Sequence, residues 1–425
     1  MNEKYGGENM TLAQSDPEIW NFYQKEWRRQ EEGLELIPSE NYASRDVMDA
    51  AGGIFTNKYA EGYPKKRYYG GNEWIDEVEL LAIERSKKLF GVPFSNVQSH
   101  AGSQANMAAY FALLQPGDTV MGLNLSQGGH LTHGSPVNFS GKLYKVAAFN
   151  VDPETHLLDY DEIARQAEAH KPKMMIAGFT AYPRQVDFGK FAKIAKSVNA
   201  KLMADMSHVA GLIAGGAHPS PTGHADVITS TTHKTLRGPR GAFILSPSEE
   251  TAKLIDKAVF PGLQGGPLEN MIMAKAVAFH EAAKPEFKTY ARQIVKNAKA
   301  LAAALMDLNF VLVSGGTDTH LILIDLRNRN MTGKEAQLAL DAAGITANKN
   351  TIPNDPQSPF ITSGLRLGTP ALTTRGMKEK EMAMVAHWMD EVLKSPSDEQ
   401  VRAKVKEEIR RMTAEFPIYP GLIKN

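Results

Sequence analysis

The sequence predicts an α/β protein with a mostly parallel central sheet flanked by helices and a smaller C-terminal α+β domain. A chain of 425 residues is longer than a single hydrophobic core usually serves, so two domains are expected. Short β-forming runs alternate with helical patterns, as they do in parallel sheets. Several of these runs are apolar on both faces, which is typical of strands that helices cover on each side.

Five short runs carry the pattern of strands in the central sheet. They are apolar and rich in β-forming residues. The expected strands cover residues 119–124, 174–180, 202–206, 227–232 and 242–245. Because ligands of open α/β sheets bind at the carboxyl ends of strands, functional side chains are expected just after these runs.

The chain is expected to divide into an N-terminal arm over residues 1–45, a large domain over 46–289 and a small domain over 290–425. In the arm, an aspartate and a proline form a helix start signal, and aromatic residues then recur on one helical face: Asp16, Pro17, Trp20, Tyr23 and Trp27. This aromatic stripe packs either on its own domain or on a second subunit.

The predicted small domain opens with a long helix that carries Ile294 and Leu301, followed by two strands at 310–313 and 321–326. A capping box then starts a helix that ends at Gly344, and a later helix has apolar residues at helical spacing. The box is Thr332 to Glu335, and the apolar residues are Met382, Val385, Met389 and Leu393.

Composition excludes several classes of function. Lys plus Arg and Asp plus Glu are both 48, so the basic surface that nucleic-acid binding requires is not expected. The absence of cysteine excludes disulfides, thiolate metal sites and cysteine nucleophiles. No apolar run is long enough for a membrane span, and the N-terminus lacks a targeting pattern, so a cytoplasmic protein is expected.

The first chemical signal is a single lysine in a polar turn after the expected strand 227–232. Lys234 stands between His233 and Arg240 in a segment rich in hydroxyl groups and glycine. A lysine that forms a Schiff base needs a lowered pKa, which burial and neighbouring cations provide. A solvated lysine is the plain alternative.

Asp205 lies in the apolar run 202–206. A carboxylate in such surroundings costs free energy unless it is paired. Pyridoxal 5′-phosphate (PLP) requires such a group, because an anion against its pyridine nitrogen keeps the ring protonated and electron-withdrawing. His208 could hold that carboxylate or a cofactor oxygen, or could make a structural hydrogen bond.

Two glycine-containing segments lie upstream. Gly102 and Ser103 open an alanine-rich helix, where free N–H groups favour a phosphate, although such a pair is often only a helix cap. His130 and His133 stand three residues apart in a glycine-rich loop. A metal would need a third ligand of matching context, which the sequence does not show, so no metal is expected. Stacking of His130 on a pyridine ring is preferred over simple backbone capping.

Arg366, in the run Gly-Leu-Arg-Leu-Gly-Thr-Pro at 364–370, can bind a substrate carboxylate with two parallel hydrogen bonds. Together with Lys234, Asp205 and the start of the helix at Gly102, it forms a coherent set for a PLP enzyme that acts on an amino acid. Walker and dinucleotide-binding glycine patterns are absent.

From about residue 35 to residue 374 the sequence resembles serine hydroxymethyltransferases. The phrases that carry the resemblance are ELIPSEN (35–41), TNKYAEGYP (56–64), KRYYGG (66–71), GHLTHGSPVNFSG (129–141) and THKTLRGPR (232–240). The resemblance implies a fold-type I PLP enzyme that interconverts serine plus tetrahydrofolate with glycine plus 5,10-methylenetetrahydrofolate. It also implies a homodimer or a dimer of dimers, with no nucleic-acid or membrane partner.

The resemblance also implies residue roles. PLP is bound by Lys234, Asp205, His130, Gly102, Ser103, Thr180, His208, Tyr59, Gly265 and Gly266, with Lys234 as the Schiff-base lysine. The catalytic residues are Lys234, Glu61, Tyr69 and His233, and the amino-acid substrate is bound by Ser39, Glu61, Tyr69 and Arg366. The folate pocket is formed by Leu125, Gly129, Leu131, Asn350 and Phe360. The second subunit is implied to contribute Tyr59, Glu61, Tyr69, Gly265 and Gly266.

Some positions depart from the family's usual residues. Lys65 replaces a glycine, Gln127 a histidine and Thr180 a serine, but none of these changes removes a catalytic group. Two other interpretations remain: a folate-independent aldolase or an α-methylserine hydroxymethyltransferase, and a catalytically silent relative that serves as a scaffold. The preserved Asn350 and Phe360 disfavour the loss of folate, and the intact catalytic set disfavours a scaffold.

Overall fold

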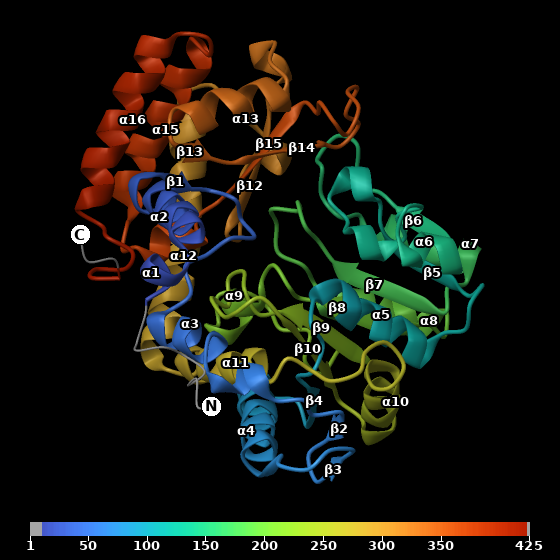
Figure 1. The fold of residues 1–425 in the computed structure, drawn as a ribbon. Coiled ribbons are helices and arrows are strands. Elements are labelled where there is room, and N and C mark those ends of the chain that lie inside the picture. Colours follow the sequence, from blue (N-terminus) through green and yellow to red (C-terminus); the bar gives the residue numbers. More distant parts are fainter. Residues whose placement is uncertain (1–10, 423–425) are drawn as a thin grey trace.

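A computed structural model describes residues 11–422 of the chain. Its central feature is a seven-stranded sheet with the strand order β4-β10-β9-β8-β7-β5-β6 (Figure 1). The strands from β9 to β6 in this order pair in parallel, whereas β10 runs antiparallel to both of its neighbours, β9 and β4. The strands are β4 Phe94–Asn96, β5 Thr119–Leu123, β6 Lys145–Phe149, β7 Met174–Gly178, β8 Lys201–Asp205, β9 Val227–Thr231 and β10 Ala242–Ser246. The predicted mostly parallel α/β fold is confirmed.

All five expected strands exist, with ends that differ by one or two residues. The edge strands β4 and β6 were not predicted from the sequence, because β4 has only three residues and β6 is exposed at three of its five positions. In β7, the odd and even positions face different cores: Met174 packs with one group of helices and Met175 with the other. Helices therefore cover both faces of the sheet, as the apolar strand runs predicted.

Helices of the large sheet pack in two layers. Helix α5 and helix α10 contact each other and share one core with the sheet, while α7, α8 and α11 contribute to the core on the other face. The helices in this part are α3 Arg45–Ala51, α4 Glu73–Phe90, α5 Gly102–Leu113, α6 Phe139–Leu143, α7 Tyr160–His170, α8 Phe188–Ser197, α9 Ala210–Ala214, α10 Glu249–Val259 and α11 Glu269–Ala282. Strands β2 Gly62–Tyr63 and β3 Lys66–Arg67 form a small hairpin.

A second, antiparallel sheet with the order β11-β12-β15-β14 has its own hydrophobic core. Its strands are β11 Val311–Leu312, β12 Leu321–Asp325, β14 Asn348–Asn350 and β15 Gly364–Gly368, and its helices are α12 Pro285–Asp307, α13 Gly333–Ala342, α14 Pro370–Thr374, α15 Glu379–Lys394 and α16 Glu399–Ala414. The capping box at Thr332 is confirmed. The expected boundary at residue 290 falls inside α12, whose Ile294 and Leu301 belong to different cores.

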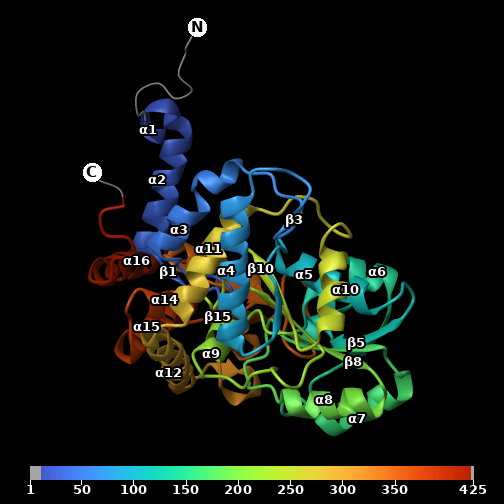
Figure 2. The same cartoon turned by 90° about the horizontal axis from the view of Figure 1, so that it is seen from below.

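The N-terminal segment consists of α1 Leu12–Ser15, α2 Pro17–Glu32 and β1 Leu34–Glu35. Strand β1 pairs in parallel with β13 Ile345–Thr346, so this segment packs against the C-terminal part of the chain. Asp16 caps α2 as predicted, with its carboxylate accepting the N–H of Ile19 at 3.1 Å. Helix α2 buries no residue, and α1 and α2 stand out from the rest of the molecule (Figure 2). Packing of its aromatic stripe on a second subunit stays a prediction.

No helix in the described part of the chain is long and apolar enough to cross a membrane.

Candidate active site

A cavity of about 450 Å³ lies where the carboxyl ends of β7, β8 and β9 approach strand β15. The register of the sheet aligns Gly178 with Asp205 and Asp205 with Thr229, so the chain leaves three neighbouring strands at one edge. Ten of the residues predicted from the sequence line this cavity: Ser39, Gly102, Ser103, His130, Thr180, Asp205, His208, His233, Lys234 and Arg366.

Lys234 lies in a turn after β9 that is fixed by hydrogen bonds at both ends. The N–H of Gly238 donates to the Thr232 carbonyl at 2.7 Å, and the Thr235 hydroxyl donates to the His208 carbonyl at 2.9 Å. Burial lowers the pKa of Lys234 to about 8, an effect that Asp205 opposes and the positive charge of Arg366 reinforces. Lys234 is therefore held as an amine that is partly neutral near physiological pH.

The Asp205 carboxylate accepts hydrogen bonds from three side chains. Asn106 Nδ2 lies at 2.9 Å, His133 Nε2 at 3.2 Å and the Ser207 hydroxyl at 2.6 Å. Burial alone would raise the pKa of Asp205, but the hydrogen bond from His133 and the charge of Lys234 outweigh it and hold this pKa below its usual range. Asp205 is thus a fixed anion at the edge of the cavity.

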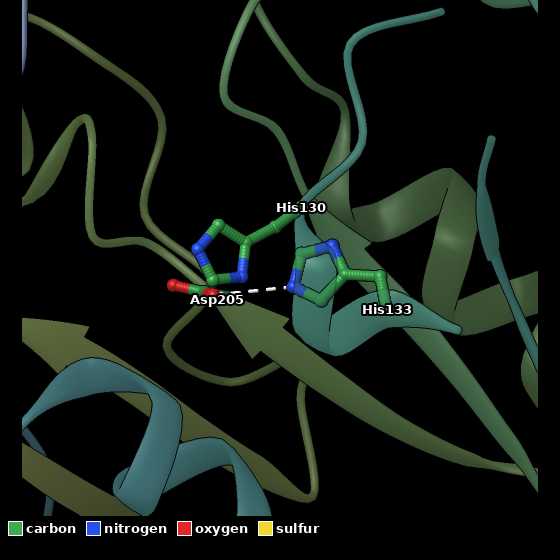
Figure 3. Close-up of side chains that lie close together, drawn as sticks. All are labelled: His130, His133 and Asp205. Carbon is green, nitrogen blue, oxygen red and sulfur yellow. Dashed lines mark hydrogen bonds and ion pairs between the residues drawn. The ribbon is translucent and has the colours of Figure 1, made fainter. Parts of the chain in front are cut away.

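The side chains of His130, His133 and Asp205 lie close together, with their ligand atoms within 4.8 Å of one another (Figure 3). The fold supplies a third candidate ligand that the sequence did not show, because it brings Asp205 to the two histidines from a distant strand. Figure 3 shows that His133 is directed at Asp205 in a hydrogen bond. The Nδ1 of His130 accepts the N–H of Thr132 at 3.2 Å, so its ring carries the proton on Nε2.

The start of helix α5 forms a cradle suited to a phosphate group. Its first backbone N–H groups have no carbonyl partner within the helix. A Cβ on Gly102 would lie 2.6 Å from Thr231 Cγ2, so only glycine fits there. Three polar atoms of residues that line the cavity are buried and lack a hydrogen-bond partner among the described residues: His100 Nε2, Thr231 Oγ1 and His233 Nδ1. This cradle, together with Lys234 and Asp205, fits a phosphorylated pyridine aldehyde.

Arg366 reaches the cavity from strand β15 of the small sheet. Its Nε donates to Asn348 Oδ1 at 3.1 Å and its Nη1 to the Thr180 carbonyl at 2.7 Å. Burial lowers the pKa of Arg366 to about 10, which still leaves the guanidinium charged. The two hydrogen bonds orient the guanidinium and leave Nη2 for an anionic ligand.

A sequence model of serine hydroxymethyltransferase matches residues 12–389 of the 425-residue chain. The match covers both sheets and every element that lines the cavity. The chain belongs to the serine hydroxymethyltransferase family. It is therefore a PLP-dependent enzyme that interconverts serine plus tetrahydrofolate with glycine plus 5,10-methylenetetrahydrofolate, and nothing favours the aldolase alternative.

In this hydroxymethyltransferase without its cofactor, the rate of the proposed reaction of Lys234 with added PLP is expected to rise with pH, to reach half of its maximum near pH 8 and to level off above about pH 9. Only the neutral amine attacks an aldehyde, and the lysine pKa is about 8 instead of the usual 10.5. Stopped-flow absorbance between about pH 6 and pH 10 measures this profile. A midpoint near the ordinary lysine value would contradict the lowered pKa.

His320 contacts a residue of the cavity lining, His208, and was not predicted from the sequence. Its Nε2 lies 3.2 Å from Nδ1 of His208, and both rings are buried. His320 Nδ1 has no hydrogen-bond partner among the described residues. A buried lone pair without a partner costs less than a buried N–H without one, so His320 carries its proton on Nε2 and donates it to His208. His208 then presents an Nε2–H donor. The one signal in the sequence is that His320 directly precedes an expected strand.

A second group of predicted residues lies outside the cavity lining. The Tyr59 hydroxyl donates to Glu61 Oε1 at 2.9 Å, and the Tyr59 and Tyr69 rings meet edge to face with centroids 5.1 Å apart. A Cβ built on Gly265 would lie 2.9 Å from Glu61 Oε1, and one on Gly266 would lie 3.3 Å from the Tyr59 ring. Both tyrosines are about half exposed, at 53% and 49%. Within one chain, these five residues form a partly exposed cluster of their own.

The residues assigned to folate are also outside the cavity lining. Leu125, Leu131 and Phe360 are exposed, Phe360 to 83%. Asn350 uses its amide to donate to the Thr351 carbonyl at 2.7 Å. A Cβ on Gly129 would meet the Leu123 carbonyl oxygen at 2.0 Å, so this position requires glycine for the turn itself.

Proposed function

We propose that the 450 Å³ cavity binds PLP and that the residues around it carry out the family reaction. The main observation in support of this proposal is that Lys234, Asp205 and the start of helix α5 line one cavity. When bound, PLP withdraws electrons from the Cα of an amino acid. Lys234 holds the cofactor covalently, Asp205 binds its ring nitrogen, and Gly102 and Ser103 bind its phosphate with free N–H groups.

The remaining residues of the cavity bind and orient the cofactor and the amino acid. His130 stacks on the cofactor ring, while Thr180 and His208 contact its oxygen. Arg366 binds the substrate carboxylate through its free Nη2, together with Ser39 and His233. The rigid attachment of Arg366 to Thr180 and Asn348 supports this role, because it fixes the guanidinium before substrate arrives.

We propose that the enzyme is a homodimer, alone or as a dimer of dimers, whose sites are completed across the interface. A partly exposed cluster outside the cavity lining of their own chain supports this use in the partner's site; its members are Tyr59, Glu61, Tyr69, Gly265 and Gly266. Glu61 then moves a proton at the substrate hydroxyl.

Mixing Lys234→Ala chains with Glu61→Gln chains tests the shared site. Each parent lacks one essential group, but a mixed dimer holds one site with both groups intact. Random exchange should therefore restore about a quarter of the unmutated activity. Turnover is measured after native mass spectrometry has verified subunit exchange. Activity no higher than that of the two parents would show that both residues act within one chain.

Glu61→Gln is expected to bind serine and PLP nearly normally but to lose most of its folate-dependent turnover, by about 10² or more. The amide keeps the shape and the hydrogen bond to the Tyr59 hydroxyl but cannot transfer a proton. Cleavage of β-phenylserine, which needs no folate, should fall less. Steady-state rates with both substrates give the comparison, and an equal loss in both would assign Glu61 to positioning alone.

We also propose that Leu125, Gly129, Leu131, Asn350 and Phe360 form the folate pocket. Exposed apolar side chains at Leu131 and Phe360 support this, because a flat pterin ring can cover them.

We place the enzyme in the cytoplasm. The domain division into 1–45, 46–289 and 290–425 is likewise a proposal, supported by the separate cores of the two sheets.

A further inference from the structure

A second cavity of about 420 Å³ lies between the segment after Ser39, the turn that carries Lys234 and the C-terminal tail. Three arginines line it, and no carboxylate side chain does: Arg45, Arg237 and Arg375. The rest of the wall is mainly aromatic and aliphatic, with Tyr42, Ile418, Tyr419 and Leu422. The cavity thus combines an unbalanced positive charge with an apolar surface.

The three arginines differ in what they bind. Arg375 is buried and donates to backbone carbonyls of the N-terminal and C-terminal segments, so its donors are used in packing. Arg45 pairs with Asp49 at 2.9 Å on the surface. No hydrogen bond or ion pair to the Arg237 guanidinium is found among the described residues, and its Nε is buried. Arg237 is therefore the arginine with donors available.

Two aromatic rings hold the Arg237 guanidinium in place, with no polar partner in the described part of the chain. Its central carbon lies 4.7 Å from the ring centroid of Tyr290 and 5.8 Å from that of Phe287. These rings orient the guanidinium plane, but they leave its N–H groups without acceptors. A partly buried cation of this kind gains free energy when an anion binds to it.

We propose that this cavity binds a small organic monocarboxylate whose carboxylate lies on Arg237 and whose apolar body lies on Tyr42, Ile418 and Tyr419. One free guanidinium matches one planar carboxylate through two parallel hydrogen bonds. A phosphate carries more charge and would require a second free cation, whereas Arg45 is paired with Asp49. The start of helix α3 also borders the cavity, at Ser44 and Arg45, but the Ser44 hydroxyl already accepts the N–H of Val47 there.

The cavity shares its wall with the turn of the catalytic lysine. The N–H of Arg237 donates to the Lys234 carbonyl at 3.1 Å. Asn41 Nδ2 donates to the same carbonyl at 3.0 Å, and the hydroxyl of Thr374, which lines the cavity, donates to Asn41 Oδ1 at 2.6 Å. A ligand on Arg237 therefore changes the surroundings of the Lys234 backbone. This effect on the active site rests on the proposed role of Lys234, whereas the binding site itself does not.

Calorimetry with benzoate, on PLP-loaded enzyme saturated with glycine at constant ionic strength, tests the site. Glycine blocks the carboxylate site at Arg366, so the expected result is one saturable site per chain. Arg237→Gln should weaken binding about tenfold or more, since it removes a charged donor pair, and Arg237→Lys should weaken it less. Arg45→Gln is the matched control and should leave the affinity within about twofold.

Three outcomes would overturn the proposal: no saturable binding of benzoate by the unmutated enzyme, unchanged affinity in a folded Arg237→Gln, or equal affinity for inorganic phosphate and benzoate. Benzyl alcohol, which has the ring but no charge, should bind far more weakly. Arg366→Gln separates this site from the proposed active site, because benzoate binding should survive that change even if substrate binding is lost. A benzoate-dependent change in the visible absorbance, absent in Arg237→Gln, would report the coupling to Lys234.

Discussion

Lys234→Ala is expected to fold and to bind PLP without a covalent bond, while turnover falls on the order of 10³-fold or more, or about 4 kcal/mol of transition-state stabilisation. The phosphate cradle at Gly102, the anion at Asp205 and the imidazole at His130 all remain. Alanine, however, offers no amine to hold the aldehyde and to displace the product. The loss should therefore lie in turnover more than in cofactor affinity.

Borohydride reduction followed by peptide mapping measures the covalent link directly. Lys275 provides a matched comparison, because it is also buried and its pKa is lowered to about 7 by burial. Its ammonium instead donates to the carbonyls of Val97, Ser99 and Ala242, which ties it to the backbone. Label on Lys275 or on any lysine other than Lys234 would refute the assignment.

Asp205→Asn is expected to reduce turnover by about 10² or more, equivalent to about 3 kcal/mol, with little loss of folded structure. The amide has the shape of the carboxylate and keeps one of its two acceptor oxygens, so the Ser207 donors on Oδ1 retain a partner while the Asn106 donor on Oδ2 loses one. It has no charge, so the pyridine nitrogen would lose the anion that keeps it protonated. The ring then withdraws electrons less strongly from the substrate Cα.

Steady-state turnover at saturating PLP and the thermal midpoint of unfolding measure these two effects separately. Ser207→Ala is the control, because it removes one hydrogen bond to Asp205 at 2.6 Å but leaves the negative charge. Its loss in turnover should be about tenfold at most. Near-normal turnover of Asp205→Asn, or an equal loss in both variants, would contradict the role of the charge.

Lys65 replaces a glycine that is usual in the family, and the fold shows the backbone conformation that this residue adopts. It stands in the turn of the β2–β3 hairpin with a φ of +65°, a conformation that glycine adopts more easily than lysine. Its N–H donates to Asp76 Oδ2 at 2.7 Å, which helps to hold the turn. Gln127, the other notable departure, accepts the N–H of Val151 at 3.0 Å and so takes part in loop structure.

The α/β fold and most of the cavity could be read from the sequence because both depend on local patterns. Apolar runs of four to seven residues identified β5, β7, β8, β9 and β10, and strand ends located Asp205 and the lysine turn. Edge strands such as β6 were missed, since a half-exposed strand has little apolar signal. Strand β15, which carries Arg366, was likewise not identified as a strand, although its arginine was selected for its chemistry.

What the sequence by itself determined is the type of chemistry and the family: a lysine after a strand, an aspartate on a buried strand, a helix start for phosphate and an arginine for a carboxylate. Only the tertiary structure decided which groups act on one another. His133 and Asn106 bind Asp205, His320 binds His208, and the Arg237 guanidinium has no polar partner among residues 11–422. These hydrogen bonds join segments that lie far apart in the sequence, by more than a hundred residues for His208 and His320. No local periodicity of the sequence encodes such contacts.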